Sequence, residues 1–272
     1  MKTSRSLIVL FVSLCLLGAP HALADTPASE PSAPAQPPAK EDVHVYLLIG
    51  QSNMAGRAKV PAEIAGVLDR AYLLDKQNQW TPAKNPFNLY STIRKGEGMQ
   101  KLGPGYAFAQ TLLEANPDAT LGLVVNARGG SRIEQWLGQD ARYYRELLKR
   151  ARAATKIGTL KGVLWHQGEA NSADPDDYAQ KLNSLIAQLR KDLGDERLPF
   201  VAGQIRFEPH QPINDIIADL PESVPHTAVA SSKGLTTYDK WHFDTESQLQ
   251  LGKRYAEAML RLHHQATNKS RP

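Results

Sequence analysis

Short apolar runs alternate along the chain with segments in which apolar residues recur at helical spacing. The first run covers residues 44–49 and stops at Gly50. Apolar runs of four to eight residues that end at a glycine or a turn are typical of buried strands. Four later runs share this character, at 121–126, 159–166, 198–204 and 227–231. We expect all five to be strands of one sheet.

Helical periodicity fills the gaps between these strands. The clearest case is 175–193, where apolar residues recur at steps of three and four, with Asp174 as N-cap, Pro175 in the first turn and Gly194 after the end. Three further helices are expected at 104–115, 141–156 and 246–264. Strands that alternate with helices of this length predict a parallel sheet covered on both faces, which is an α/β fold of three layers, an αβα sandwich.

Residues 61–102 follow neither pattern clearly. This segment is rich in Gly, Pro and Asn and contains one tryptophan, Trp80. We expect it to pass over the functional face of the sheet, with one short strand at 71–74.

The N-terminus has the features of an export signal. Lys2 and Arg5 precede an apolar run at 7–17 that is too short to span a bilayer, and Ala22-Leu23-Ala24 supplies small residues at a cleavage site. We expect residues 1–24 to be a signal peptide and the protein to be secreted or periplasmic, without membrane attachment after cleavage.

The rest of the chain divides into three parts. Residues 25–41 are rich in Pro and Ala, with too little apolar bulk to offset the entropy of ordering, so they should form a linker. Residues 42–266 should form one domain, followed by a disordered tail at 267–272. We expect the domain to be a monomer.

Composition excludes several kinds of chemistry. The chain has one cysteine, Cys15, and it lies within the expected signal peptide, so catalysis by cysteine and a cysteine-ligated metal are excluded in the mature protein. The formal net charge is +4, and removal of Lys2 and Arg5 leaves the mature chain near neutral. No basic run points to nucleic acid as a partner.

Polar clusters follow the predicted strands. Ser52 is the first hydroxyl after the first strand, and further clusters occupy 126–131, 165–169 and 239–242. In open α/β sheets, ligands bind outside the carboxyl ends of the strands. We therefore expect these clusters to meet at one edge of the sheet.

Together the clusters supply what acyl transfer by serine requires: a nucleophile, a base, an acid that orients the base, and donors for the oxyanion. His242 is placed to deprotonate Ser52, and either Asp239 or Glu169 to hold the imidazole. The oxyanion donors we expect are the backbone N–H groups of Ser52 and Gly130 and the side-chain amide of Gln167.

Four motifs sharpen this interpretation: GQSNM at 50–54, RGGS at 128–131, WHQGE at 165–169 and DKWHF at 239–243. In this order they resemble the blocks of the sialate O-acetylesterase-like branch of SGNH hydrolases, which includes the acetyl xylan esterases of carbohydrate esterase family six. The similarity runs from about Val43 to Leu262. It implies a parallel, flavodoxin-like sheet and a carbohydrate esterase that acts on an O-acetylated sugar.

The same resemblance implies roles for single residues. Ser52 corresponds to the nucleophile and His242 to the base. The wider superfamily places the acid three residues before the histidine, at Asp239, whereas this branch assigns the helper role to the glutamate of HQGE, Glu169, and both remain open. Gln167 stands where the superfamily has asparagine, one methylene shorter.

Substrate binding is assigned to Gln51, Arg128 and Trp241. Two roles are open for Arg128: it donates hydrogen bonds to loop carbonyls, or it binds the substrate. Trp241 is placed to stack on a sugar ring.

Several alternatives compete with these assignments. His166 reads better as a buried, hydrogen-bonded histidine than as a catalytic group. Ser131 is a rival nucleophile, although an N-cap role fits it better. His166, Glu169, Asp239 and His242 together suggest a zinc site, which would leave the serine motif unexplained.

We therefore expect a serine esterase that removes O-acetyl groups from carbohydrate through an acetyl-enzyme, with no metal or other cofactor. Two other functions stay open: a carbohydrate-binding protein on an inactive esterase fold, and an esterase or thioesterase for lipid acyl chains.

Overall fold

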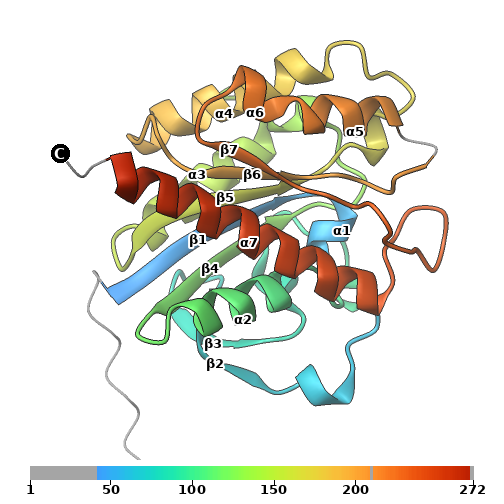
Figure 1. Ribbon diagram of the computed structural model, residues 1–272. Helices are drawn as coiled ribbons and strands as arrows, with labels where there is room; N and C mark the ends of the chain where they lie inside the picture. The colour runs from blue at the N-terminus through green and yellow to red at the C-terminus, as the bar shows by residue number, and fades with distance from the viewer. Residues whose placement is uncertain (1–41, 209–210, 270–272) are drawn as a thin grey trace, which may run out of the picture. The chain divides into compact units, whose positions relative to one another are not determined.

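The computed structural model describes residues 42–208 and 211–269; the expected signal peptide and linker at 1–41 lie outside them. Its sheet has seven strands in the order β3-β2-β4-β1-β5-β6-β7 (Figure 1). Their bounds are β1 (Val43–Gly50), β2 (Val67–Leu74), β3 (Trp80–Lys84), β4 (Thr120–Ala127), β5 (Thr159–His166), β6 (Phe200–Gly203) and β7 (Thr227–Ala230). All five strands expected from apolar runs are present.

Five of the six pairs of neighbouring strands are parallel, and the sixth, β2 with β3, is antiparallel. The sheet is thus mixed rather than wholly parallel. Only residues 75–79 join β2 to β3, too few for the crossover that a parallel pair needs. The Asp75 carboxylate accepts the backbone N–H groups of Gln77 and Gln79 at 2.8 Å and closes this turn.

The longer helices are α2 (Gly105–Ala115), α3 (Arg142–Ala154), α4 (Tyr178–Leu193), α5 (Gln211–Ala218) and α7 (Thr245–Lys269). The described residues also contain two short helices, α1 (Ser52–Ala55) and α6 (Leu220–Ser223), and five 3₁₀ turns. The turns are η2 (Ala62–Ile64), η3 (Phe87–Tyr90), η4 (Glu97–Met99), η5 (Ile133–Trp136) and η6 (Glu169–Asn171).

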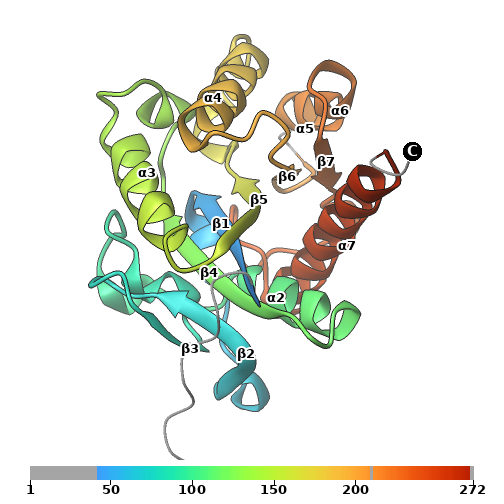
Figure 2. The same cartoon turned by 90° about the vertical axis from the view of Figure 1, so that its left-hand side faces the viewer.

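Strand β1 shows how the sheet forms two cores. Val45, Leu47 and Ile49 face one side and Tyr46 and Leu48 the other, since side chains of a strand alternate between faces, and all five are buried. Helices α3, α4 and α5 pack on the first side and α2 with α7 on the second (Figure 2). This arrangement confirms the three-layer αβα sandwich.

Several element ends differ from the predictions, and the strand expected at 71–74 begins earlier, at Val67. Residues 175–177 form a turn, and α4 begins at Tyr178, three residues later than the Asp174-Pro175 signal suggested. Its end at Gly194 is as predicted, with a left-handed φ of 74°. At the other end of the chain, α7 continues through Lys269 and includes the first residues of the expected tail.

None of the helices that the structure describes is long and apolar enough to cross a bilayer.

Candidate active site

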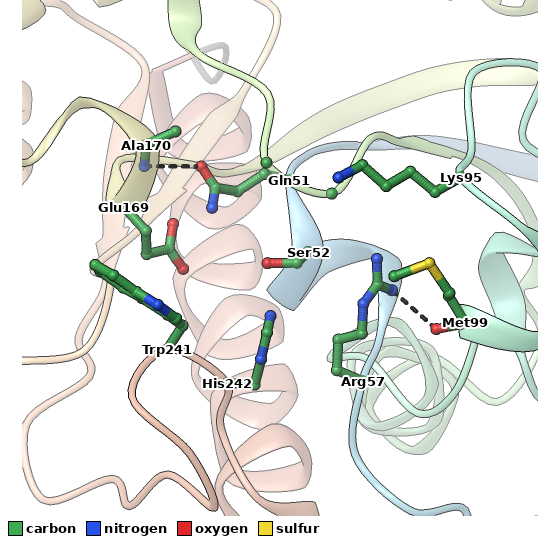
Figure 3. A pocket seen from close by; sticks show the side chains of 11 residues that line it. Gln51, Ser52, Arg57, Lys95, Met99, Glu169, Ala170, Trp241 and His242 are labelled. Carbon is green, nitrogen blue, oxygen red and sulfur yellow. Dashed lines mark hydrogen bonds between the residues drawn. The ribbon is translucent and has the colours of Figure 1, made fainter.

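A pocket of about 310 Å³ opens beyond the carboxyl ends of β1, β4 and β5 (Figure 3). The segment after β1, which includes α1, contributes three of its lining residues, and the loops after β4 and β5 and the loop before α7 contribute two each. The lining consists of Gln51, Ser52, Arg57, Lys95, Met99, Gly129, Gly130, Glu169, Ala170, Trp241 and His242. The predicted polar clusters thus do meet at one edge of the sheet.

Ser52 reaches the pocket because Gly50 lets β1 turn sharply beside β5. Gly50 has a φ of +132°, and a Cβ atom there would lie 2.1 Å from the backbone oxygen of His166. This close approach allows the Gln51 N–H to donate to the same His166 oxygen at 2.8 Å. Ser52 follows at the start of α1, only 7% exposed.

His242 faces Ser52 across the pocket, with one ring nitrogen directed toward the serine hydroxyl (Figure 3). The other nitrogen, Nδ1, lies 2.7 Å from Oδ2 of Asp239. Oδ1 of Asp239 accepts the backbone N–H groups of Trp241 and His242 at 2.8 and 2.7 Å. Desolvation alone would raise the pKa of Asp239, but these hydrogen bonds lower it below its usual value, so the carboxylate beside the imidazole stays ionised.

Glu169, the other candidate acid, lies in the pocket wall but is bound elsewhere. Its Oε1 accepts a 2.6 Å hydrogen bond from the Asn53 amide, and its Oε2 is buried without a hydrogen-bond partner. The imidazole beside Glu169 is that of His166, whose Nε2 lies 3.8 Å from Oε1 without a hydrogen bond, and burial lowers the pKa of His166 to about 3, so this ring is neutral. Burial raises the pKa of Glu169 to about 7, and the Asn53 hydrogen bond offsets part of that rise. Of the two acids, Asp239 is the one that holds the His242 ring.

The expected oxyanion donors are not all in place. Gly130 lines the pocket beside Ser52, and its neighbour Gly129 lies so close that a Cβ atom there would meet the Arg57 guanidinium at 2.5 Å. Gln167 is fully buried and does not line the pocket. The structure therefore does not support Gln167 as a direct donor, because its amide hydrogens are directed to groups behind the pocket wall.

Arg128 stabilises a loop by hydrogen bonds and does not contact the pocket where a substrate would bind. One nitrogen of its guanidinium donates to the backbone oxygens of Ile93 and Arg94 at 3.1 and 3.2 Å, and Arg128 does not line the pocket. The other two residues assigned to substrate binding, Gln51 and Trp241, do line it.

Two positively charged side chains of the pocket, Arg57 and Lys95, were not identified from the sequence. Arg57 is 8% exposed and donates to the backbone oxygens of Gly56 and Met99. Lys95 points into the pocket from the loop between η3 and η4 (Figure 3). Neither forms an ion pair with a carboxylate within residues 42–208 and 211–269. Arg57 follows Ser52 by five positions, a signal that could have been noticed, whereas the position of Lys95 depends on the fold of the irregular segment.

The structure also gives the positions of His166 and Ser131, the residues of the rival assignments. His166 is fully buried with Nδ1 3.0 Å from the Tyr255 hydroxyl, which confirms a buried, hydrogen-bonded histidine. Ser131 is buried outside the pocket, and its hydroxyl accepts the Trp136 indole N–H at 3.1 Å; the N-cap of η5 is Arg132 instead. In the part of the chain that the structure describes, no three His, Cys, Asp or Glu side chains are grouped as metal ligands.

Known proteins resemble this chain over most of its length. Residues 42–261 match the family described as carbohydrate esterase, sialic acid-specific acetylesterase. A probable carbohydrate esterase of Arabidopsis thaliana, At4g34215, is 32% identical over 241 residues, which cover 79% of this chain and 90% of the relative.

Solved structures show the same fold. The At4g34215 structure has a TM-score of 0.72 at 28% identity, over 82% of this chain and 99% of the other. NanS has a TM-score of 0.68 at 18% identity, covering 83% and 99%. XAC1771, a carbohydrate acetylesterase of Xanthomonas citri, has a TM-score of 0.64 at 22% identity, covering 82% and 57%. The chain belongs to the carbohydrate esterase family of sialic acid-specific acetylesterases, and its fold is that of SGNH hydrolases.

Proposed function

We propose that this protein is an exported serine esterase that removes acetyl groups from the hydroxyls of a carbohydrate through an acetyl-enzyme. The observation that carries the proposal is the joint position of Ser52 and His242 on one pocket, with Asp239 2.7 Å from the far nitrogen of the imidazole. A serine, a base and an acid that orients the base suffice for ester hydrolysis without a cofactor.

In the first half-reaction, Ser52 Oγ attacks the acetyl carbon and its proton passes to His242 Nε2. The π electrons of the carbonyl move onto its oxygen to give a tetrahedral oxyanion. When this intermediate collapses, the bond to the sugar oxygen breaks and that oxygen takes the proton from His242. The products are acetyl-Ser52 and the free sugar hydroxyl.

In the second half-reaction, water attacks the acetyl carbon and gives a proton to His242. A second oxyanion forms and collapses, the bond between carbon and Ser52 Oγ breaks, and Oγ takes back the proton. Acetic acid leaves and releases its proton to solvent to give acetate, and the enzyme returns to its starting state. Ionised Asp239 favours the imidazolium that forms twice in each cycle.

The lining of the pocket supports an acetylated sugar over a lipid acyl chain. Met99 and Trp241 are its large apolar side chains, and six of the other lining residues are polar or charged, among them Arg57, Lys95 and Glu169. Arg57 and Lys95 add positive charge, which suits a sugar that carries a carboxylate. Sialic acid, named in the description of the family, is such a sugar.

Export is part of the proposal and is supported by the pattern of residues 1–24. The test is the N-terminal sequence of the protein recovered from a cell that exports it, which should begin at Asp25.

The test of function is acetate release by the mature chain. We expect hydrolysis of an aryl acetate, loss of that activity in Ser52→Ala, and acetate release from an acetylated sugar, fastest with an acidic one. A panel of acetylated sialic acid, xylan and cell-wall glycan measures this preference. Binding of these sugars without acetate release would favour the inactive-fold alternative, and a preference for octanoate over acetate would favour the lipid esterase.

A further inference from the structure

Gln51 has a side chain that is nearly buried and yet presents unused donors to the pocket. The residue is 3% exposed and lines the pocket next to Ser52. Its amide nitrogen is directed into the cavity on the side of the Ser52 hydroxyl (Figure 3). Within the described part of the chain, this nitrogen makes no hydrogen bond. A donor that has no partner in the protein and faces the pocket beside Ser52 points to a ligand that accepts a hydrogen bond there.

A backbone donor indicates which atom of this amide is the oxygen. The backbone N–H of Ala170 donates to Gln51 Oε1 at 3.4 Å, and the Gln167 amide nitrogen lies 3.2 Å from the same oxygen. A backbone N–H can only donate, so the Gln51 atom that faces it must be the carbonyl oxygen. The NH₂ group of Gln51 is therefore the part that faces the pocket.

Gln167, which lies behind Gln51 as seen from the pocket, is also oriented by hydrogen bonds. Its amide nitrogen lies 2.8 Å from Oδ1 of Asn171, 3.1 Å from the backbone oxygen of Ser131 and 3.2 Å from Gln51 Oε1, so one of its two hydrogens is shared between two of these acceptors. That Asn171 oxygen accepts the backbone N–H of Ile133 at 3.0 Å, which fixes it as an acceptor. Backbone groups thus anchor both ends of the chain of amides that leads to Gln51.

We propose that the side-chain amide of Gln51 donates a hydrogen bond to the oxyanion of the tetrahedral intermediates, and that Gln167 is a positioning residue that orients Gln51. This inference rests on the proposed esterase function. The backbone N–H groups of Ser52 and Gly130 would complete the set of donors, since neither makes a hydrogen bond within the described residues. The amide of Gln51 thus takes the role expected of Gln167.

The chemistry explains why such a donor acts on turnover. When Ser52 Oγ bonds to the acetyl carbon, the carbonyl oxygen gains a full negative charge, and a hydrogen bond to it becomes stronger than in the ester. An interaction that is stronger in the transition state raises kcat. Removal of one oxyanion donor typically lowers kcat by about 10²- to 10³-fold.

The test compares Gln51→Leu and Gln51→Glu with the wild type on an aryl acetate. Leucine removes both donors, and glutamate keeps the shape of the side chain but presents an acceptor to the oxyanion. We expect kcat to fall by about 10²- to 10³-fold in Gln51→Leu and by at least as much in Gln51→Glu, with KM close to that of the wild type. Gln110→Leu, on the exposed face of α2, is the matched control and should keep its activity.

A boronic acid gives a second readout that a loss of stability alone would not produce. Ser52 adds to the boron of methylboronic acid while its proton passes to His242, and the product is a tetrahedral anion that resembles the intermediate. Its affinity should fall in parallel with kcat in the Gln51 variants. Thermal unfolding of each variant shows whether the fold is kept.

Gln167→Met tests the positioning role. It removes one of the two groups that hold Gln51 Oε1, so kcat should fall by less than in Gln51→Leu. The double variant Gln51→Leu/Gln167→Met should be no slower than Gln51→Leu alone, because residues that act as one unit are not additive. Multiplicative losses would show that Gln167 acts independently of Gln51 and would overturn its role.

The outcomes separate this inference from the proposed function. If the wild type does not hydrolyse the acetate, or if Ser52→Ala does so equally well, the proposed function fails. If the wild type is active and depends on Ser52, but Gln51→Leu keeps its kcat or only raises KM, the oxyanion role of Gln51 fails while the esterase stands.

Discussion

The buried carboxyl of Glu169 should make the protein less stable as pH rises from about 4.5 to about 7. Burial raises the pKa of Glu169 from 4.5 to about 7 in the folded protein, with partial compensation from backbone and Asn53 hydrogen bonds. A carboxyl with a higher pKa in the folded state keeps its proton longer there than in the unfolded chain. Its contribution to stability is fully present below the unfolded pKa and is lost as pH rises through the folded pKa.

The size of the effect follows from these two pKa values. A difference of one in pKa corresponds to about 1.4 kcal/mol, so the change from 4.5 to about 7 corresponds to a loss of about 3 kcal/mol. Glu169→Gln replaces the carboxyl with a neutral group of the same shape that can still accept the Asn53 hydrogen bond. The variant should lack this loss, and relative to it the wild type should become less stable by about 3 kcal/mol between pH 4 and pH 8.

Urea unfolding of the wild type and Glu169→Gln at a series of pH values measures this difference. Subtracting the two curves removes the contributions of all other titrating groups. Glu257→Gln, which removes an exposed carboxyl on α7, is the matched control for a generic change of charge. The reasoning is refuted if the difference between wild type and Glu169→Gln does not change with pH, or if the wild type gains relative stability as pH rises.

Three further predictions concern the pocket. Ser52→Ala should keep the fold and lower turnover by orders of magnitude, whereas Ser131→Ala should change little; the reverse result in acetate-release assays would reject Ser52 as nucleophile. Gly50→Ala should destabilise the protein by at least about 2 kcal/mol, because its Cβ would strike a backbone oxygen at a strained φ; a near-neutral result in urea unfolding contradicts this geometry. Exhaustive chelation should leave the rate unchanged, and a loss with EDTA that zinc restores would revive the zinc-site alternative.

The parts of the fold that were predictable from sequence are those whose residues are buried on both faces. Strands such as β1 and β5 form nearly continuous apolar runs, which no turn or exposed helix imitates. Strand β3 was missed because it contains Pro82 and the polar residues Thr81 and Lys84 and lies at the edge of the sheet, where exposed residues are tolerated. The start of α4 was predicted too early because Asp174 and Pro175 are equally common at the start of a helix and in a turn, and here they precede the helix in a turn.

A residue of the candidate site was predictable only where its position relative to a strand determines that it lies at the edge of the sheet. Ser52 and His242 were found because a polar residue just beyond a strand or in a facing loop must lie at the edge of the sheet. The choice between Gln51 and Gln167 was not accessible in this way. Both follow adjacent strands, β1 and β5, and the amide that faces the pocket is selected by the Ala170 N–H and the Ser131 oxygen, whose positions only the folded loops define.

The choice between the two acids depends on the same kind of detail. The spacing of three residues lets Asp239 bind the backbone and the ring of His242 at once, so acid and base form one local unit. Glu169 instead binds Asn53, whose amide also donates to the Trp241 oxygen and accepts the Phe243 N–H, the two neighbours of His242.

Each acid should therefore act on His242 by a different route. Asp239→Asn should lower kcat by up to about 10⁴-fold, because it disturbs the tautomer and the imidazolium directly. Glu169→Gln should cause a smaller loss, because it acts only through the position of the loop that Asn53 holds. Since both act on one imidazole, the double variant should be much less than multiplicatively worse. A larger loss in Glu169→Gln than in Asp239→Asn, measured as kcat on an aryl acetate, would mean that the loop contact matters more than the carboxylate at the ring.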